Sequence, residues 1–242
     1  MFDKYASKIK SIKEFNKEDI LVSDFNLYDD GKISIYYAPH NEIINKSAKI
    51  FIVGITPGWS QTSIAYKTAN GGLNNRLDYE SIKCECKKNS RFAGSMRKNI
   101  IEMLDELNIP KYLNIPSSSM LFEECDNLLH TTSVIPYPVF VKMKNYTGSN
   151  PKILESEILY SYVKKYFYKE ARELSTALYI PLVKSVEEVL VLMIKEGILK
   201  ESQCLLGFPH PSGANGHRKK QFEINKKELS QKVDDFFKNR GE

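Results

Sequence analysis

The sequence predicts an α/β protein, a three-layer α/β/α sandwich with a mainly parallel four-stranded sheet. Four apolar runs alternate with segments of helical periodicity, which is the pattern of strands joined by right-handed crossover helices. Two of these runs, 50–53 and 204–206, end in elbows rich in glycine and proline, as buried strands do at the ligand-binding edge of a parallel sheet. A chain of 242 residues fits one large domain, so we expect a single domain over 1–242.

The first half of the chain predicts a short N-terminal region, a central strand and a long loop. Residues 1–45 are expected to form a helix and then an edge strand at Ile33–Tyr37. Residues 50–53 are continuously apolar, as in a central parallel strand. The segment 61–90 is polar and rich in asparagine, glycine and lysine, so we interpret it as a long insertion loop, either a lid or a mobile segment.

The middle of the chain predicts two helices around a second strand. Met96–Leu107 has apolar residues at helical spacing and is followed by Pro110 as a stop. The second strand is expected within 127–134. Asn150-Pro151 predicts a helix start, with asparagine as the cap and proline at the first position, and this helix is expected to run to about Arg172.

The last third of the chain completes the alternation. A third strand is expected at 177–183, followed by a Ser185-x-x-Glu188 capping box that opens a helix ending near Gly197. The fourth strand is expected at 204–208. An amphipathic C-terminal helix is predicted from the spacing of Phe222, Leu229, Val233 and Phe236.

Composition narrows the class of protein. Lysine and arginine total 35 against 30 acidic residues, a net charge of +5, which fits a polyanion partner or simply a mildly basic face. No stretch approaches the roughly 20 apolar residues of a membrane span, and the charged segment 1–13 is no signal peptide. We therefore expect a cytoplasmic monomer with reduced cysteines. Cys84-Glu85-Cys86 lacks zinc-knuckle spacing, so no metal or other cofactor is expected.

The second elbow has the more specific chemistry. His210 lies between two prolines, and a small, polar run follows it at 212–216. The basic run 217–220 then opens the last helix, where an anionic ligand would meet both the side chains and the helix N-terminus. The alternative is an ordinary surface turn with a structural histidine. Nucleotide-binding glycine motifs and a G-x-S-x-G nucleophile elbow are absent from the sequence.

In order along the chain, four segments resemble motifs of the uracil-DNA glycosylase superfamily. Val53–Gly58 is similar to the first signature motif of that superfamily, and His210-Pro211-Ser212 to the second. Between them, Arg91–Ser95 is similar to the segment that places an aromatic ring under the extruded base, and Leu128–Thr132 falls where the superfamily has a strand ending in asparagine. The resemblance spans about 50–220.

The resemblance implies a DNA glycosylase that flips uracil or another deaminated base out of DNA and hydrolyses its N-glycosidic bond. His210 would stabilise the departing base and Thr56 would occupy the water-positioning place. Base binding would fall to Gly54, Ile55, Phe92 and His130. DNA contacts would fall to Pro57, Gly58, Ser212, Gly213, Asn215, Arg218 and Lys219. The implied partner is DNA, in single or double strands, without a cofactor.

Two departures from the superfamily pattern leave alternatives open. Thr56 replaces the usual carboxylate or amide, and a threonine orients water but does not act as a base at neutral pH. His130 replaces an asparagine and has one donor and one acceptor on separate nitrogens, so the preferred base need not be uracil; the alternative is a structural histidine. The chain could therefore be a weak or inactive nucleic-acid-binding protein of this fold. A small-molecule or nucleotide α/β hydrolase is the second alternative.

Overall fold

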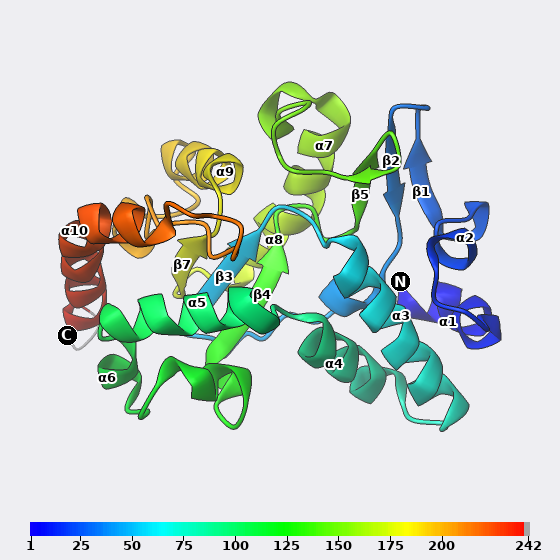
Figure 1. The fold of residues 1–242 in the computed structure, drawn as a ribbon, viewed down its shortest axis with the longest axis horizontal. Coiled ribbons are helices and arrows are strands. Elements are labelled where there is room, and N and C mark those ends of the chain that lie inside the picture. The colour runs from blue at the N-terminus through cyan, green and yellow to red at the C-terminus, as the bar shows by residue number, and fades with distance from the viewer. Residues whose placement is uncertain (240–242) are drawn as a thin grey trace. The chain divides into compact units, whose positions relative to one another are not determined.

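The computed structural model describes residues 1–239, and the protein is mixed α/β (Figure 1). The chain divides into two compact units, each assembled from three segments. The antiparallel unit comprises Met1–Ile44, Thr56–Arg91 and Ile135–Pro151; the parallel unit comprises Asn45–Ile55, Phe92–Val134 and the chain from Lys152 onward. The expected single domain over 1–242 stays a prediction.

A three-stranded parallel sheet is the centre of the parallel unit, in the order β4-β3-β7 (Figure 1). Its strands are β3 (Ile50–Gly54), β4 (Leu129–Ser133) and β7 (Leu178–Pro181). Ile50 lies opposite Leu129 on one side and Leu178 on the other. The predicted central strand and the predicted second and third strands are therefore confirmed.

Helices cover both faces of this parallel sheet. They are α5 (Gly94–Glu106), α6 (Ile109–Leu113), α7 (Glu157–Tyr162), a π-helical turn (Val163–Phe167), α8 (Tyr168–Glu173), α9 (Lys184–Lys195) and α10 (Arg218–Lys238), with 3-10 turns at Ser118–Phe122, Asp126–Leu128, Ile153–Glu155 and Glu201–Gln203. Ile50 and Ile52 pack into an apolar core with residues of α5, α6 and α10. On the opposite face the ring of Phe51 contacts that of Phe167, and the Tyr179 hydroxyl donates to the carbonyl of Ala171.

The predicted fourth strand at 204–208 is wrong as an extended element. Only Cys204 forms a bridge, parallel to Tyr179 in β7. The chain turns at once, because the amide of Leu206 donates back to the carbonyl of Cys204 and Gly207 adopts a left-handed φ of 84°. The segment still enters the sheet beside β7, and the elbow follows at the carboxyl edge.

Three predicted helix boundaries are also wrong. Pro110 lies inside α6 and is not the stop of α5, which ends before the left-handed Asn108. The helix expected from Asn150-Pro151 begins at Glu157. Ser185 does not cap α9, because that helix begins one residue earlier and its N-cap makes no side-chain hydrogen bond. The predicted C-terminal helix is confirmed.

The antiparallel unit has a separate four-stranded sheet in the order β1-β2-β5-β6. Its strands are β1 (Asn26–Asp29), β2 (Ile33–Tyr36), β5 (Val139–Val141) and β6 (Lys144–Asn145). Figure 1 shows β2 between β1 and β5. The strand predicted at Ile33–Tyr37 therefore exists but is not an edge strand, because both of its neighbours pair with it.

Helices replace the long loop that the sequence predicts at 61–90. The antiparallel unit contains α1 (Phe2–Ser11), α2 (Lys17–Ile20), α3 (Trp59–Asn74) and α4 (Tyr79–Ser90), with 3-10 turns at Ser23–Phe25 and Pro39–Asn41. α3 and α4 pack closely because the contact residues are small: a Cβ on Gly72 would lie 2.7 Å from the side chain of Ile82. Asp78 caps α4 by accepting from the amide of Ser81 at 2.9 Å.

Candidate functional site

The second elbow, residues 207–216, is fastened at its start by two side chains. Glu187 Oε2 of α9 accepts a hydrogen bond from the amide of Gly207 at 2.9 Å, and Asn225 Nδ2 of α10 donates to the carbonyl of Gly207 at 2.7 Å. The left-handed φ of Gly207 suits a residue without a Cβ. Both bonds fix the direction in which the chain leaves the sheet.

The geometry of His210 defines its tautomer. Its Nδ1 accepts a hydrogen bond from the amide of Ser212 at 3.1 Å, so in the neutral ring the proton lies on Nε2. The ring is half-buried, and this burial lowers the pKa of His210 below its ordinary value of 6.5. At neutral pH, His210 is therefore a neutral imidazole with an Nε2–H group available as a hydrogen-bond donor.

Several residues predicted to contact DNA also brace the second elbow. Asn215 Nδ2 donates to the carbonyl of His210 at 3.1 Å, and Ser212 Oγ accepts from the amide of Ala214 at 3.2 Å. Arg218 reaches the carbonyl of Ser212 at 3.5 Å. Gly213 and Lys219 are exposed. The elbow is thus a rigid, internally bonded loop, and its DNA contacts stay predictions.

The structure brings the segment around Phe92 next to the second elbow. Asn99 of α5 is buried, and its Nδ2 donates to the carbonyl of Pro211 at 2.7 Å. A Cβ on Gly213 would lie only 2.9 Å from Ser95 Oγ at the start of α5. Phe92, two residues before α5, is half-buried and packs against the core of the parallel unit. Phe92 and His210 are therefore carried by segments in direct contact.

Gly54 ends β3 and Ile55 follows it, at the same edge of the sheet as the second elbow. Both are half-buried. Gly54 lies opposite Ser133 at the carboxyl end of β4, and a Cβ on Gly54 would lie 3.5 Å from Ser133 Oγ. Because β3 and the Cys204 segment run parallel, the chain that follows each one emerges on one edge.

His130 does not lie at this edge, which corrects its predicted base-binding role. It is the second residue of β4, opposite Phe51, and is fully buried. Its Nδ1 accepts from the amide of Asn45 at 3.3 Å, so Nε2 carries the proton and donates to Glu170 Oε1 at 2.5 Å. The strand continues for three residues beyond His130, which places the imidazole in the interior of the unit.

The first elbow, residues 56–58, belongs to the antiparallel unit, where Thr56 holds two backbone groups. Its hydroxyl donates to the carbonyl of Tyr137 at 2.6 Å and accepts from the amide of Val139 at 3.1 Å. One lone pair remains, so Thr56 retains only the ability to accept a hydrogen bond from a water. Pro57 is buried and offers no surface for DNA, whereas Gly58 is half-buried. The catalytic role of Thr56 stays a prediction.

Sequence reasoning missed the polar residues that hold the second elbow. Asn99 falls within the helix predicted at Met96–Leu107, three residues after Met96, and a polar residue on an apolar helix face is a signal for a buried hydrogen bond. Glu187 and Asn225 gave no such signal, since their partner Gly207 is distant in sequence and the contact depends on the fold.

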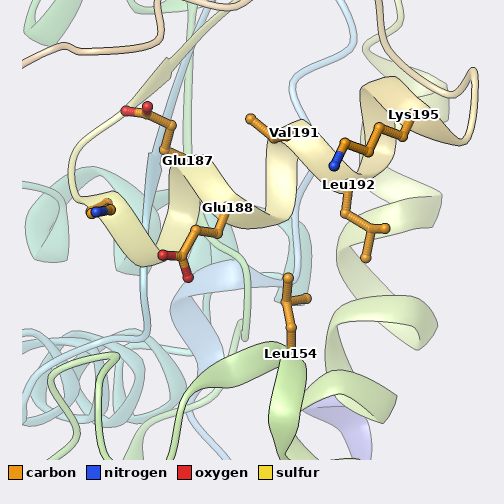
Figure 2. A pocket seen from close by; sticks show the side chains of 7 residues that line it. Leu154, Glu187, Glu188, Val191, Leu192 and Lys195 are labelled. Carbon is orange, nitrogen blue, oxygen red and sulfur yellow. The ribbon is translucent and has the colours of Figure 1, made fainter.

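A shallow pocket of about 300 Å³ runs along α9. Figure 2 shows Glu187 and Glu188 toward one end of it, with Leu192 and Lys195 toward the other. None of the sequence-predicted site residues lines this pocket, and Glu187 also accepts the Gly207 amide. The pocket therefore shares Glu187 with the attachment of the second elbow, and His210 does not line it.

Residues 1–239 contain neither a candidate metal-binding cluster nor a candidate membrane-spanning helix. No group of three or more histidine, cysteine, aspartate or glutamate side chains there could hold a metal ion. Within the same residues, no helix combines the length and apolar character needed to cross a membrane.

Comparison with known proteins gives a family. The chain is 44% identical over 234 residues to the uncharacterized protein YoxB of Bacillus subtilis (strain 168), and the alignment covers 96% of this chain and 91% of the relative. The chain belongs to the YoxB family. No family model matches the chain, and no solved structure matches it. The name YoxB assigns no activity.

Replacing Asn99 by alanine is expected to loosen the second elbow. The substitution leaves the carbonyl of Pro211 without its buried donor, a loss of about 1–3 kcal/mol in the free energy of unfolding. Urea unfolding measures this loss, and hydrogen exchange of the Ser212 amide should become faster. Lys98→Ala, one residue away on the exposed side of α5, should change neither. Equal exchange in both variants would contradict the bracing role.

Proposed function

We propose that this protein is a DNA glycosylase that releases uracil or another deaminated base. The observation that supports this most directly is the state of His210: a neutral imidazole with Nδ1 engaged by the Ser212 amide and Nε2–H available. Cleavage of an N-glycosidic bond leaves negative charge on the departing base. A preorganised donor aimed at such charge typically contributes about 10²–10³-fold in rate.

Phe92 would complete the base-binding side of the site. Its segment contacts the second elbow through Ser95 and Gly213, so an aromatic face and the His210 donor are held by one rigid substructure. Stacking of an extruded base on such a ring contributes about 1–3 kcal/mol. Gly54 and Ile55 lie at the same sheet edge and would line this space.

The layered arrangement of the parallel unit, the partner, the oligomeric state and the location in the cell are part of the same proposal. We propose a three-layer α/β/α arrangement for the parallel unit, whose three-stranded sheet is extended beyond β7 only by the single bridge between Cys204 and Tyr179. A DNA partner, a monomeric state and a cytoplasmic location accompany this function. Arg218 and Lys219 at the start of α10 provide positive charge for phosphates.

The test is release of the base from oligonucleotides that carry uracil, hypoxanthine or xanthine, in single and double strands. Wild-type protein should produce abasic sites on at least one of them, and His210→Ala should lower the rate by about 100-fold or more. His217→Ala is the comparison variant: His217 is an exposed histidine of the adjacent basic run, and its loss should lower the rate far less than the loss of His210. Equal rates for wild type and His210→Ala would overturn the assignment of His210.

A second candidate is a nucleic-acid-binding protein of this fold with little or no glycosylase activity. It is favoured by Thr56, whose hydroxyl is committed to Tyr137 and Val139 and cannot act as a base. Salt-sensitive DNA binding without base release on any of the three substrates would select this candidate over the first.

A further inference from the structure

The hairpin between β5 and β6 presents two side chains on an unusual backbone. Val141 pairs with Lys144, so the turn consists of Lys142 and Met143 alone. Both are left-handed, with φ of 50° and 61°. Two-residue hairpin turns of this kind strongly prefer asparagine and glycine, because a Cβ is disfavoured there. Side chains that are kept at strained backbone positions often serve a function. The exposed side chains of this turn are therefore candidates for a binding role.

The tip exposes one large apolar side chain between two cations. Met143 is 50% exposed. Lys142 and Lys144 are exposed on either side of it, and neither pairs with a carboxylate within the described part of the chain. The tip therefore combines one exposed apolar side chain with two ammonium groups that are available to an anionic partner.

The neighbouring turn places one further lysine and two aspartates beside the tip. The amide of Lys142 donates to the carbonyl of Lys32 at 3.0 Å, so the exposed Lys32 lies next to it. The two aspartates of that turn are negative, but their carboxylates accept local backbone amides: Asp29 from Gly31, and Asp30 from Lys32 and Ile33. Within residues 1–239, none of the three lysines has a carboxylate partner.

The hairpin is also fixed to the first elbow. Asn145 Oδ1 accepts from the amide of Trp59 at 3.1 Å, and a Cβ on Gly58 would lie 3.8 Å from Asn145 Nδ2. Thr56 holds the other end of β5 through Tyr137 and Val139. β5 itself pairs with β2 (Figure 1). The hairpin and the first elbow are therefore held together, with Met143 two residues before Asn145.

We propose that the tip Lys142-Met143-Lys144 is a wedge that enters duplex DNA. The lysines bind phosphates on either side of one step, and Met143 inserts between the bases and unstacks them. Proteins that distort DNA use apolar side chains, methionine included, in this way. The inference rests on the proposed function only in taking DNA as the partner, and it requires no catalysis. An acidic protein surface would also attract the lysines but would leave DNA stacking unchanged.

The test uses a duplex with 2-aminopurine, whose fluorescence rises when the base unstacks. Wild-type protein should raise the fluorescence, and Met143→Gly should reduce that rise at least fivefold. Glycine accepts a positive φ without strain, so this variant should fold at least as well as wild type. Ile64→Ala, which truncates another exposed apolar side chain of the same unit, 40% exposed, should behave as wild type.

A second variant tests the cations. Lys142→Gln with Lys144→Gln should lower the slope of log K against log salt by about 1.8, since each phosphate contact contributes about 0.9. An unchanged slope, or a Met143→Gly variant that unstacks DNA as wild type does, overturns the wedge. A protein that unstacks DNA through Met143 but releases no base supports the wedge and overturns the glycosylase. Failure of the wild type to bind DNA at low salt overturns both.

Discussion

Replacing His130 by leucine is expected to lower the free energy of unfolding by about 3–5 kcal/mol, because it leaves a buried carboxylate unpaired. Glu170 is 6% exposed, and His130 Nε2 is the hydrogen-bond donor to its Oε1. No other donor to that carboxylate is found in residues 1–239. Leucine is close to histidine in size, so the loss reports the stranded carboxylate and, in smaller part, the Asn45 amide that loses its acceptor. Urea unfolding at pH 7 measures it.

The double variant His130→Leu with Glu170→Leu is the control for this loss. It removes the carboxylate together with its partner, and replacing a whole buried pair by apolar residues is often nearly neutral. The double variant should therefore recover most of the stability lost by the single one. If the double variant is as unstable as His130→Leu, packing beside Phe51 explains the loss and the pair does not.

His130 also shows where the sequence stops being informative. The apolar run correctly predicts a strand within 127–134, but it does not give the register. The difference between a strand-end histidine and a buried one is only three residues of β4. The partner that decides its role, Glu170, is 40 residues away and reaches it only through the packing of α8 on the sheet.

The prediction of a loop at 61–90 was wrong for a different reason. Its composition is polar, but its buried positions are filled by small residues such as Ala65, Ala69 and Gly72. Small residues give a weak apolar pattern although they allow two helices to approach closely. Composition therefore indicated a loop, whereas the spacing of the small residues was the better signal.

The second elbow was the most predictable part of the site. Glycine and proline mark the turn, and a histidine between two prolines has little backbone freedom. The tautomer of His210, by contrast, depends on the Ser212 amide lying within 3.1 Å of Nδ1. That distance follows from the loop bonds of Asn215 and Asn99, which no local pattern specifies. The short strands β5 and β6 were missed because three and two residues carry no periodicity.

Acid is expected to destabilise the protein through His40. This side chain is fully buried, neither ring nitrogen has a hydrogen-bond partner within the described residues, and burial lowers its pKa from 6.5 to about 3, with a smaller contribution from the Lys87 ammonium. The folded pKa lies below the unfolded one, so the unfolded chain binds the proton first. Stability is full above pH 6.5 and falls as the pH drops toward 3, by about 2 kcal/mol between pH 7.5 and 5.

The variant His40→Leu isolates this effect. Leucine does not titrate and needs no hydrogen bond, so the difference in unfolding free energy between pH 7.5 and 5 should shrink by about 2 kcal/mol relative to wild type. His217→Leu is the control, because His217 is exposed and its removal should leave the pH dependence intact. Urea unfolding of the three proteins at both pH values gives the six free energies of unfolding needed. A wild-type dependence that persists unchanged in His40→Leu would show that other groups carry the acid sensitivity, and that His40 acquires a partner in solution.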